Sequence, residues 1–383
     1  MKKYFYLGIT GLILFEIANV FFIMPMPGSQ ELDSIELAYF LYSWRWAFRL
    51  LFGIMILTGL RSAFQSLKWL PALLLLIAGT VIYAANFKMA ADHMFYQPSV
   101  MVMGTAENNI VDRERLVLGI HYNGEAKAYP IQYLGYHHQV RDSIGGKPVM
   151  VTYCTVCRTG RVFEPIVHGK TENFRLVGMD HYNAMFEDES TKSWWRQVTG
   201  ESVAGKLKGE KLPEIASVQT TLGKWLELYP QSRIMQADPG FSKQYTSMSD
   251  YEQGSERGRL TRRDTGSWQP KSWVIGVIAG NKEKAYDWNR LQRENIIYDE
   301  INSIPVAIVL AQDKASFAAF ERRSANQKFQ INNDSLESNG IKYSFLGKSF
   351  YDSIPSLKNI PASQEYWHSW KTFHPNTLID QQN

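Results

Sequence analysis

Three long apolar runs occupy the first ninety residues, and they constrain the fold more than any other feature. They extend from Tyr4 to Met24, from Leu37 to Leu60 and from Trp69 to Phe87. As helices rising 1.5 Å per residue, all three are long enough to cross a hydrocarbon core of about 30 Å. Because no A-x-A-like cleavage site follows the first run and two more runs come after it, we expect an anchor and not a signal peptide. Residues 1–88 are therefore predicted to form a three-helix transmembrane segment whose partner is the lipid bilayer.

The basic residues around these runs predict an orientation. Lys2 and Lys3 precede the first run, and Arg61 and Lys68 lie between the second and the third. The loop between the first two runs is acidic and has no Lys or Arg before Arg45. Since basic loops stay in the cytoplasm, the N-terminus is predicted to be cytoplasmic. The protein would then lie in the inner (cytoplasmic) membrane, with everything after about residue 86 periplasmic or extracellular.

Charged residues inside the predicted spans need partners. Glu16 lies in the first span, and Arg45 and Arg49 lie in the second. An ionisable side chain in a membrane pairs with another or faces a polar interior. Because the depths of these residues roughly match, we expect an ion pair between Glu16 and either Arg49 or Arg45.

The remainder of the chain contains the only two cysteines, Cys154 and Cys157, at the end of an apolar, β-branched run. A C-x-x-C pair indicates either a redox couple or half of a metal site, and a third reading is a structural staple. In the predicted exoplasmic compartment a disulfide would persist. Gly160, Val162 and Pro165 follow the pair and favour a turn and a strand over the helix of a thioredoxin-like motif. Haem attachment is disfavoured because no histidine follows Cys157.

The redox and the metal hypotheses require different residues near the two cysteines. In a redox protein, His137 or Arg158 would lower the pKa of the first thiol. In a metal site, two more ligands are needed beside two cysteines. Thiolate, imidazole and thioether together suit a soft ion such as Cu(I) better than a hard one, and the expected metal is copper or zinc. The candidate ligands are Cys154, Cys157, His137, His138, His181 and Met185.

An internal repeat is predicted in the exoplasmic part. Gly276 and its neighbours match Gly119 and its neighbours at an offset of 157 (276 − 119), and the match continues without a gap. Fixed-period similarity is the signature of a repeated structural unit. The second copy has Ala311 and Lys314 at the positions of the two cysteines, so the first copy is the expected site-bearing lobe.

These patterns predict the fold class and the domains. Alternating short runs separated by Asn-Gly and Gly-Gly turns predict β-hairpins. We therefore expect an N-terminal three-helix transmembrane segment followed by a β-rich (α+β) exoplasmic part built from two degenerate repeats. The predicted boundaries are residues 105–240 for the first lobe, 241–270 for a linker and 271–383 for the second lobe. With 41 basic and 37 acidic residues, the charge is too balanced to predict nucleic-acid binding.

The motif around the cysteines resembles a known family. The resemblance is carried by Ala128-Tyr129-Pro130-Ile131, by Gly145-Gly146-x-Pro148-Val149-x-Val151-Thr152-Tyr153-Cys154-x-x-Cys157 and by Thr191-Lys192-Ser193-Trp194-Trp195-Arg196-Gln197. It is to the domain of unknown function family 3179, from about residue 105 to the end. Some members of that family carry selenocysteine in the cysteine motif, which implies redox chemistry. Where the family often has His-Glu, this sequence has His137-His138.

The sequence thus predicts a membrane-anchored exoplasmic thiol–disulfide redox protein. Cys154 would attack and Cys157 would resolve the mixed disulfide. A protein thiol or a small oxidant would be the substrate. The first alternative is a copper- or zinc-binding module that uses the same cysteines, and the second is a non-enzymatic structural membrane protein.

Overall fold

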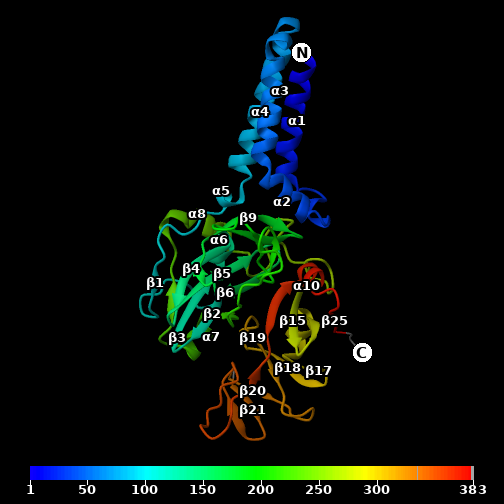
Figure 1. Cartoon of the computed structure of the whole chain (residues 1–383). Coiled ribbons are helices and arrows are strands. Elements are labelled where there is room, and N and C mark those ends of the chain that lie inside the picture. The colour runs from blue at the N-terminus through cyan, green and yellow to red at the C-terminus, as the bar shows by residue number, and fades with distance from the viewer. Residues whose placement is uncertain (334, 381–383) are drawn as a thin grey trace. The chain divides into compact units, whose positions relative to one another are not determined.

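The computed structural model describes residues 1–333 and 335–380, and the chain divides into two compact units (Figure 1). The first unit contains residues 1–96 together with residues 172–211. The second contains residues 97–171 together with the chain from residue 212 onward. Residues 172–211, which fall within the predicted lobe of residues 105–240, form a sheet whose core partners are the N-terminal helices and the segments next to them.

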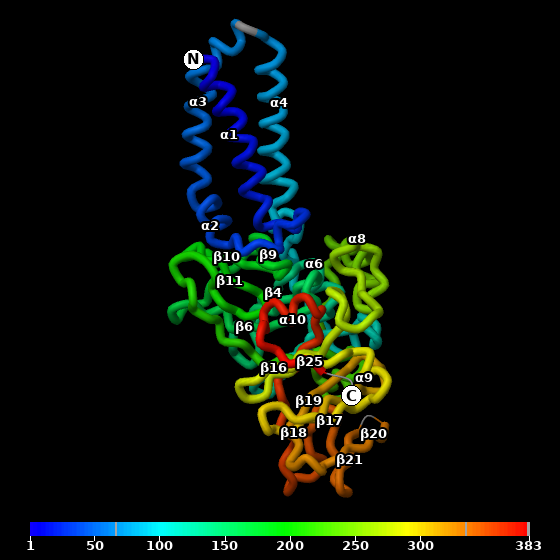
Figure 2. Tube along the Cα trace, turned by 90° about the vertical axis from the view of Figure 1, so that its right-hand side faces the viewer, coloured from blue at the N-terminus to red at the C-terminus, as the bar shows by residue number. Residues whose placement is uncertain are grey.

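Three helices of the first unit are long and apolar enough to span a membrane, and they indicate a membrane protein. They are α1 (Lys2–Phe21), α3 (Arg45–Ser66) and α4 (Trp69–Tyr83), the last continued by the π-helical segment η2 (Ala84–Lys88). They lie side by side in both views (Figures 1 and 2). The predicted second span was wrong at its start, because a break at Trp44 separates the short helix α2 (Ile35–Ser43) from α3.

The predicted ion pair within these helices is confirmed, and Arg49 is the partner. The Arg49 guanidinium donates to both carboxylate oxygens of Glu16, at 2.7 and 2.9 Å. The Asn86 amide joins the pair, donating to Glu16 and accepting from Arg49. Arg45 instead donates to the Tyr42 carbonyl. The buried Glu16 carboxylate is therefore satisfied by two other helical segments.

A four-stranded sheet completes the first unit. Its order is β12-β11-β10-β9, with β9 Phe174–Asp180, β10 Asn183–Asp188, β11 Trp194–Arg196 and β12 Ser202–Ala204. Its apolar face packs on residues that follow α1, including Ile23, and on α2, through Ala38. Trp194 is fully buried there, and its indole donates to Glu187. The short elements η1 (Ser29–Glu31) and α5 (Ala91–Met94) lie in the connections.

The first half of the second unit holds two larger sheets and a two-stranded one. One has the order β1-β14-β3-β2-β13, with β1 Met103–Gly104, β2 Leu116–Tyr122, β3 Glu125–Pro130, β13 Val218–Thr221 and β14 Arg233–Met235. The other is β4 (Gln139–Ile144), β5 (Lys147–Cys154) and β6 (Thr159–Phe163). The helices are α6 (Ile131–His137), α7 (Leu222–Leu228) and α8 (Ser242–Ser247), with η3 (Pro239–Phe241) and the hairpin β7 (Ile166–Val167) to β8 (Lys170–Thr171).

The second half of this unit holds three sheets. Two have the orders β24-β15-β16-β25 and β17-β18-β19-β23, and the third is β20-β21-β22. Their strands are β15 Trp273–Ala279, β16 Lys282–Asp287, β17 Ile296–Ile301, β18 Ile304–Leu310, β19 Phe317–Glu321, β20 Gln330–Asn332, β21 Ser335–Ser338, β22 Ile341–Tyr343, β23 Lys358–Asn359, β24 Ala362–Tyr366 and β25 Leu378–Ile379. The helices are α9 (Trp288–Glu294) and α10 (Trp367–Phe373).

The two halves share an element order and local contacts. The order β2-β3-α6-β4-β5-β6 recurs as β15-β16-α9-β17-β18-β19. Gly119 pairs with Ala128 in the first half as Gly276 pairs with Ala285 in the second. A tyrosine hydroxyl donates to an aspartate in each, Tyr129 to Asp142 at 2.7 Å and Tyr286 to Asp299 at 2.8 Å. Corresponding residues of the two halves thus make the same strand pairing and the same tyrosine–aspartate hydrogen bond.

Residues 241–270, predicted to be a linker, are packed into the second unit. Tyr251 is fully buried, and Glu252 is buried with its carboxylate accepting from the Leu116 amide. The Arg263 guanidinium lies 4.1 Å above the Trp273 ring. This segment therefore belongs to the core around the cysteine motif.

Candidate functional site

The C-x-x-C motif lies in a tight β-hairpin turn. Strand β5 ends at Cys154, β6 begins at Thr159, and these two residues pair across the hairpin. Residues 155–158 form the turn, and Arg158 has the left-handed φ of 57°. The expectation of a turn and a strand after the motif is confirmed. The side chains of Cys154 and Cys157 are brought together at the mouth of this hairpin, where they hydrogen-bond to each other.

Both thiols are inaccessible to solvent, with 0% exposure. Burial and the hydrogen bond to Cys154 raise the pKa of Cys157 well above its ordinary value. The hydroxyl of Ser369 and the positive charge of Lys271 act in the opposite direction. Cys157 therefore keeps its proton at neutral pH.

The second half of the unit supplies the other side of the site. The Lys271 ammonium donates to the carbonyl of Val156, between the two cysteines, at 2.7 Å. His368 on α10 places Nε2 3.0 Å from the same carbonyl and 3.1 Å from Lys271 Nζ. Burial lowers the pKa of Lys271 to about 8 and, together with the Lys271 charge, that of His368 to about 3. The imidazole of His368 is consequently neutral, and the Lys271 ammonium loses its proton more readily than an exposed lysine does.

Backbone and side-chain bonds fix the turn against this second half. The Tyr366 amide donates to the Cys157 carbonyl at 2.9 Å, and the Tyr251 hydroxyl donates to the Thr155 carbonyl at 2.9 Å. Ser369, which reaches Cys157, also donates to Glu365 at 2.9 Å. The site is thus assembled from strands and segments more than 90 residues apart in the sequence.

Arg158 anchors the turn. Its guanidinium is 1% exposed, donates to Gln364 and to the Tyr251 and Glu252 carbonyls, and lies 3.7 Å above the Trp273 ring. These partners stabilise a buried guanidinium by hydrogen bonds and a cation–π contact. That Arg158 lowers the pKa of the first thiol stays a prediction.

The two neighbouring histidines have separate surroundings. His138, in the left-handed conformation that ends α6, places Nδ1 2.9 Å from the Tyr153 carbonyl, next to Cys154. Burial lowers its pKa to about 4. His137 places Nε2 2.7 Å from the Tyr245 hydroxyl, and its ring packs edge-on against Phe241. Both rings are buried, and a catalytic role for His137 stays a prediction.

The other predicted metal ligands have partners in the first unit. His181 Nδ1 lies 2.7 Å from the Asp180 carboxylate, and its Nε2 lies 3.3 Å from Asp33. Met185 is fully buried in the apolar cluster with Trp194. Within residues 1–333 and 335–380, no three His, Cys, Asp or Glu side chains gather in a way that could hold a metal ion. The alternative ligand set is therefore not assembled by the described residues.

Lys271 and His368 are the site residues that the sequence reasoning missed. Lys271 falls next to the predicted linker, and His368 falls in the lobe that lacks cysteines. Neither residue forms a motif with Cys154 or Cys157, so only tertiary contact reveals them.

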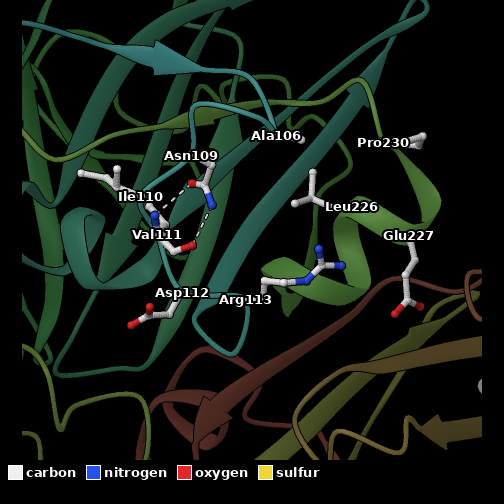
Figure 3. A pocket seen from close by; sticks show the side chains of 9 residues that line it. All are labelled: Ala106, Asn109, Ile110, Val111, Asp112, Arg113, Leu226, Glu227 and Pro230. Carbon is white, nitrogen blue, oxygen red and sulfur yellow. Dashed lines mark hydrogen bonds between the residues drawn. The ribbon is translucent and has the colours of Figure 1, made fainter.

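A surface cavity of about 500 Å³ lies elsewhere in the second unit (Figure 3). Leu226, Glu227 and Pro230 line it on one side, and residues 109–113 line it on the other. The Asn109 side chain is committed to the backbone of Val111 (Figure 3). Neither cysteine lines this cavity, so it does not serve the thiol chemistry.

Comparisons with known proteins place the chain from residue 96 to residue 377, which includes parts of both units, in one family. The model of the family described as “Protein of unknown function (DUF3179)” matches residues 96–377. No curated protein and no solved structure matches the chain. The match covers most of the chain and includes the cysteine turn as well as Lys271 and His368.

Proposed function

The chain belongs to the family described as “Protein of unknown function (DUF3179)”, and from its site we propose that it is a membrane-anchored thiol–disulfide redox protein. One observation carries the proposal: the side chains of Cys154 and Cys157 hydrogen-bond to each other within one hairpin turn. A pair that already touches as two thiols needs little rearrangement to become a disulfide.

The unequal environments of the two thiols support separate roles. Burial and the contact with Cys154 raise the pKa of Cys157, so Cys157 keeps its proton, and we assign the attacking thiolate to Cys154. The Cys154 thiolate attacks one sulfur of a substrate disulfide, and the other substrate sulfur leaves as a thiolate. Cys157 then loses its proton and attacks Cys154, which releases the second substrate thiolate. The protein loses two electrons and gains the Cys154–Cys157 disulfide, and the substrate gains those electrons. The reverse sequence oxidises a dithiol.

Burial limits the substrate. Because both sulfurs are fully covered, a folded protein cannot reach them while the segment around Lys271 and α10 stays in place. A small disulfide or oxidant is therefore the favoured substrate class. A protein thiol would require this cover to move.

The membrane helices and their orientation bear on the compartment in which the cysteines would work. Three apolar helices and the basic residues Lys2, Lys3, Arg61 and Lys68 support a cytoplasmic N-terminus. The cysteine unit would then lie outside the cytoplasm, where a disulfide persists. The shared element order of the two halves supports an ancestral duplication in which the second copy lost its cysteines and became the cover of the site.

The test is a redox titration of the full-length protein, purified in detergent without oxygen or chelator. After equilibration in graded dithiothreitol mixtures, free thiols are alkylated and counted by mass, and bound metals are measured by elemental analysis. We expect both cysteines to titrate together in one reversible two-electron step, which Cys154→Ser and Cys157→Ser each abolish. Thiols that stay unchanged at every ratio would refute the proposal in favour of a packing role. Stoichiometric copper or zinc that blocks alkylation would refute it in favour of a metal site.

A further inference from the structure

Cys157, the resolving thiol, needs a base to accept its proton, and residues of the second half lie close to it. Cys157 is fully buried and holds its proton tightly, yet it must become a thiolate to attack the mixed disulfide. Water does not reach it directly. A base inside the site must therefore accept the proton.

Lys271 is placed for this task. Its Nζ is held between the Val156 carbonyl at 2.7 Å and His368 Nε2 at 3.1 Å, and Val156 is the residue that precedes Cys157. The charged form of Lys271 interacts with both cysteines, and more strongly with Cys157 than with Cys154. We propose that Lys271 is the general base that takes the proton of Cys157 when this thiol resolves the mixed disulfide. This inference rests on the proposed redox function and deepens it.

Burial makes the neutral amine of Lys271 accessible, although several of the groups that face it favour the ammonium. The groups that face Lys271 are the two thiols, the imidazole of His368, the ring of Tyr366 at 4.6 Å, and the Asp264 carboxylate, which accepts from the Lys271 backbone amide at 2.9 Å. Burial outweighs these carboxylate and thiol charges and lowers the pKa of Lys271 to about 8. At pH 7, about one amine in ten is then neutral and able to act as a base.

The surroundings also hold the amine in place. The amide of His368 donates to the Pro270 carbonyl at 3.0 Å, and the amide of Trp367 donates to the Ser272 carbonyl at 2.9 Å. Helix α10 and the segment around Lys271 therefore form one body. The proton transfer is balanced: Cys157 loses H⁺ to the amine, which becomes an ammonium, and the leaving substrate thiolate or solvent later recovers that proton.

The experiment separates the two chemical steps with 2,2′-dithiodipyridine, a small uncharged disulfide that releases one chromophoric thiopyridone per step. In the full-length reduced protein, Cys154 releases the first equivalent and Cys157 releases the second. We expect Lys271→Met to slow the second release about a hundredfold. In wild type the rate of the second release should level off above about pH 8, whereas in Lys271→Met it should keep rising with pH.

Lys271→Arg is the decisive variant, because arginine keeps the positive charge and the hydrogen bonds but cannot accept a proton at these pH values. A slow second release in this variant supports the role of Lys271 as the general base. A normal second release, or one that is normal in Lys271→Met, overturns it and leaves the redox proposal intact. Lys282→Met, at an exposed lysine of the same half, is the matched control. Should native wild type release nothing while the denatured chain releases two equivalents, the redox proposal falls and this inference falls with it.

Discussion

His138 is a buried imidazole in a left-handed backbone conformation, with a φ of 59°. Burial lowers its pKa from 6.5 to about 4. Between these two pH values His138 is protonated in the unfolded chain but neutral in the folded chain. Its protonation therefore lowers the free energy of unfolding as the pH falls from about 6.5 to about 4. The full effect is about 3 kcal/mol, reached near pH 4.

The prediction is that His138→Asn makes the protein less sensitive to acid. Asparagine tolerates the left-handed conformation, and Asn295 occupies the corresponding place in the second half. Thermal unfolding measured between pH 7 and pH 4 should show a smaller loss of melting temperature than in wild type. Part of the loss should persist because His368 is also buried with a lowered pKa. Identical pH profiles would contradict the prediction.

Arg158 joins the cysteine turn to the second half of its unit. In Arg158→Met the Glu252 carbonyl loses its donor, whereas the Tyr251 carbonyl keeps the Gly254 amide and the Gln364 side chain keeps that of Gln219. We expect a loss of about 2 to 3 kcal/mol in stability, with faster alkylation of both cysteines in the loosened turn. Thermal unfolding in detergent and mass-detected alkylation measure the two effects. Arg141→Met, at an exposed arginine on β4, should change neither quantity.

At the scale of elements, each half packs a tryptophan of its closing helix on a glycine of its central strand. A Cβ at Gly276 would lie 2.1 Å from the Trp370 ring, and one at Gly119 would lie 2.4 Å from the Trp225 ring. Each indole is also fixed by a hydrogen bond, Trp370 to Thr377 and Trp225 to Ser232. The rings therefore cannot move aside without breaking a bond.

The prediction is that Gly276→Ala and Gly119→Ala each destabilise the second unit by about 1 to 3 kcal/mol through overpacking. Gly266→Ala is the matched control, since its Cβ would meet Gln269 only at an ordinary 3.7 Å. Denaturant unfolding followed by tryptophan fluorescence measures the change. Equal stability of Gly266→Ala and Gly276→Ala would show that the helix shifts freely.

The membrane helices are joined by the Glu16, Arg49 and Asn86 cluster. Glu16→Gln leaves a guanidinium without its counter-charge in an apolar bundle, and we expect a loss of about 3 kcal/mol. Size-exclusion chromatography after heating in detergent reports the folded fraction. The double variant Glu16→Gln/Arg49→Gln should lose less than the sum of the two single variants. Strict additivity would mean that the pair is not coupled.

At the scale of the molecule, the first unit is assembled from two separated stretches of the chain, residues 1–96 and 172–211. If the N-terminus is cytoplasmic, the sheet of this unit and the cysteine unit lie on the outer side of the membrane. Alkaline phosphatase fused after Lys68 in a bacterial host should then be inactive, and the same enzyme fused after Tyr96 should be active. The reverse pattern would place the cysteines in the reducing cytoplasm and remove the argument for a persistent disulfide.

Local patterns predicted much of the second unit. The hairpin of β4 and β5, the turn after Cys157 and the strand β2 follow from β-branched runs and glycine turns, which act over a few residues. The pairing of β9 with β10, in the first unit, was not predicted. Strand partners are chosen by the fit of whole apolar faces, and local propensity does not carry that information.

Local features of the sequence were enough to predict the three apolar helices, the counter-charge of Glu16 in the bundle, the β-rich part of the chain, and the turn and strand at the cysteine pair. Each follows from hydrophobic length, charge or turn chemistry within a short stretch. Long-range contacts, in contrast, show that residues 172–211 join the helices, that Tyr251 and Glu252 of the predicted linker are buried, and that Lys271 and His368 meet at the Val156 carbonyl. Those contacts bring together residues that are distant in sequence, and they form because folding must bury the remaining apolar faces while pairing most buried polar groups.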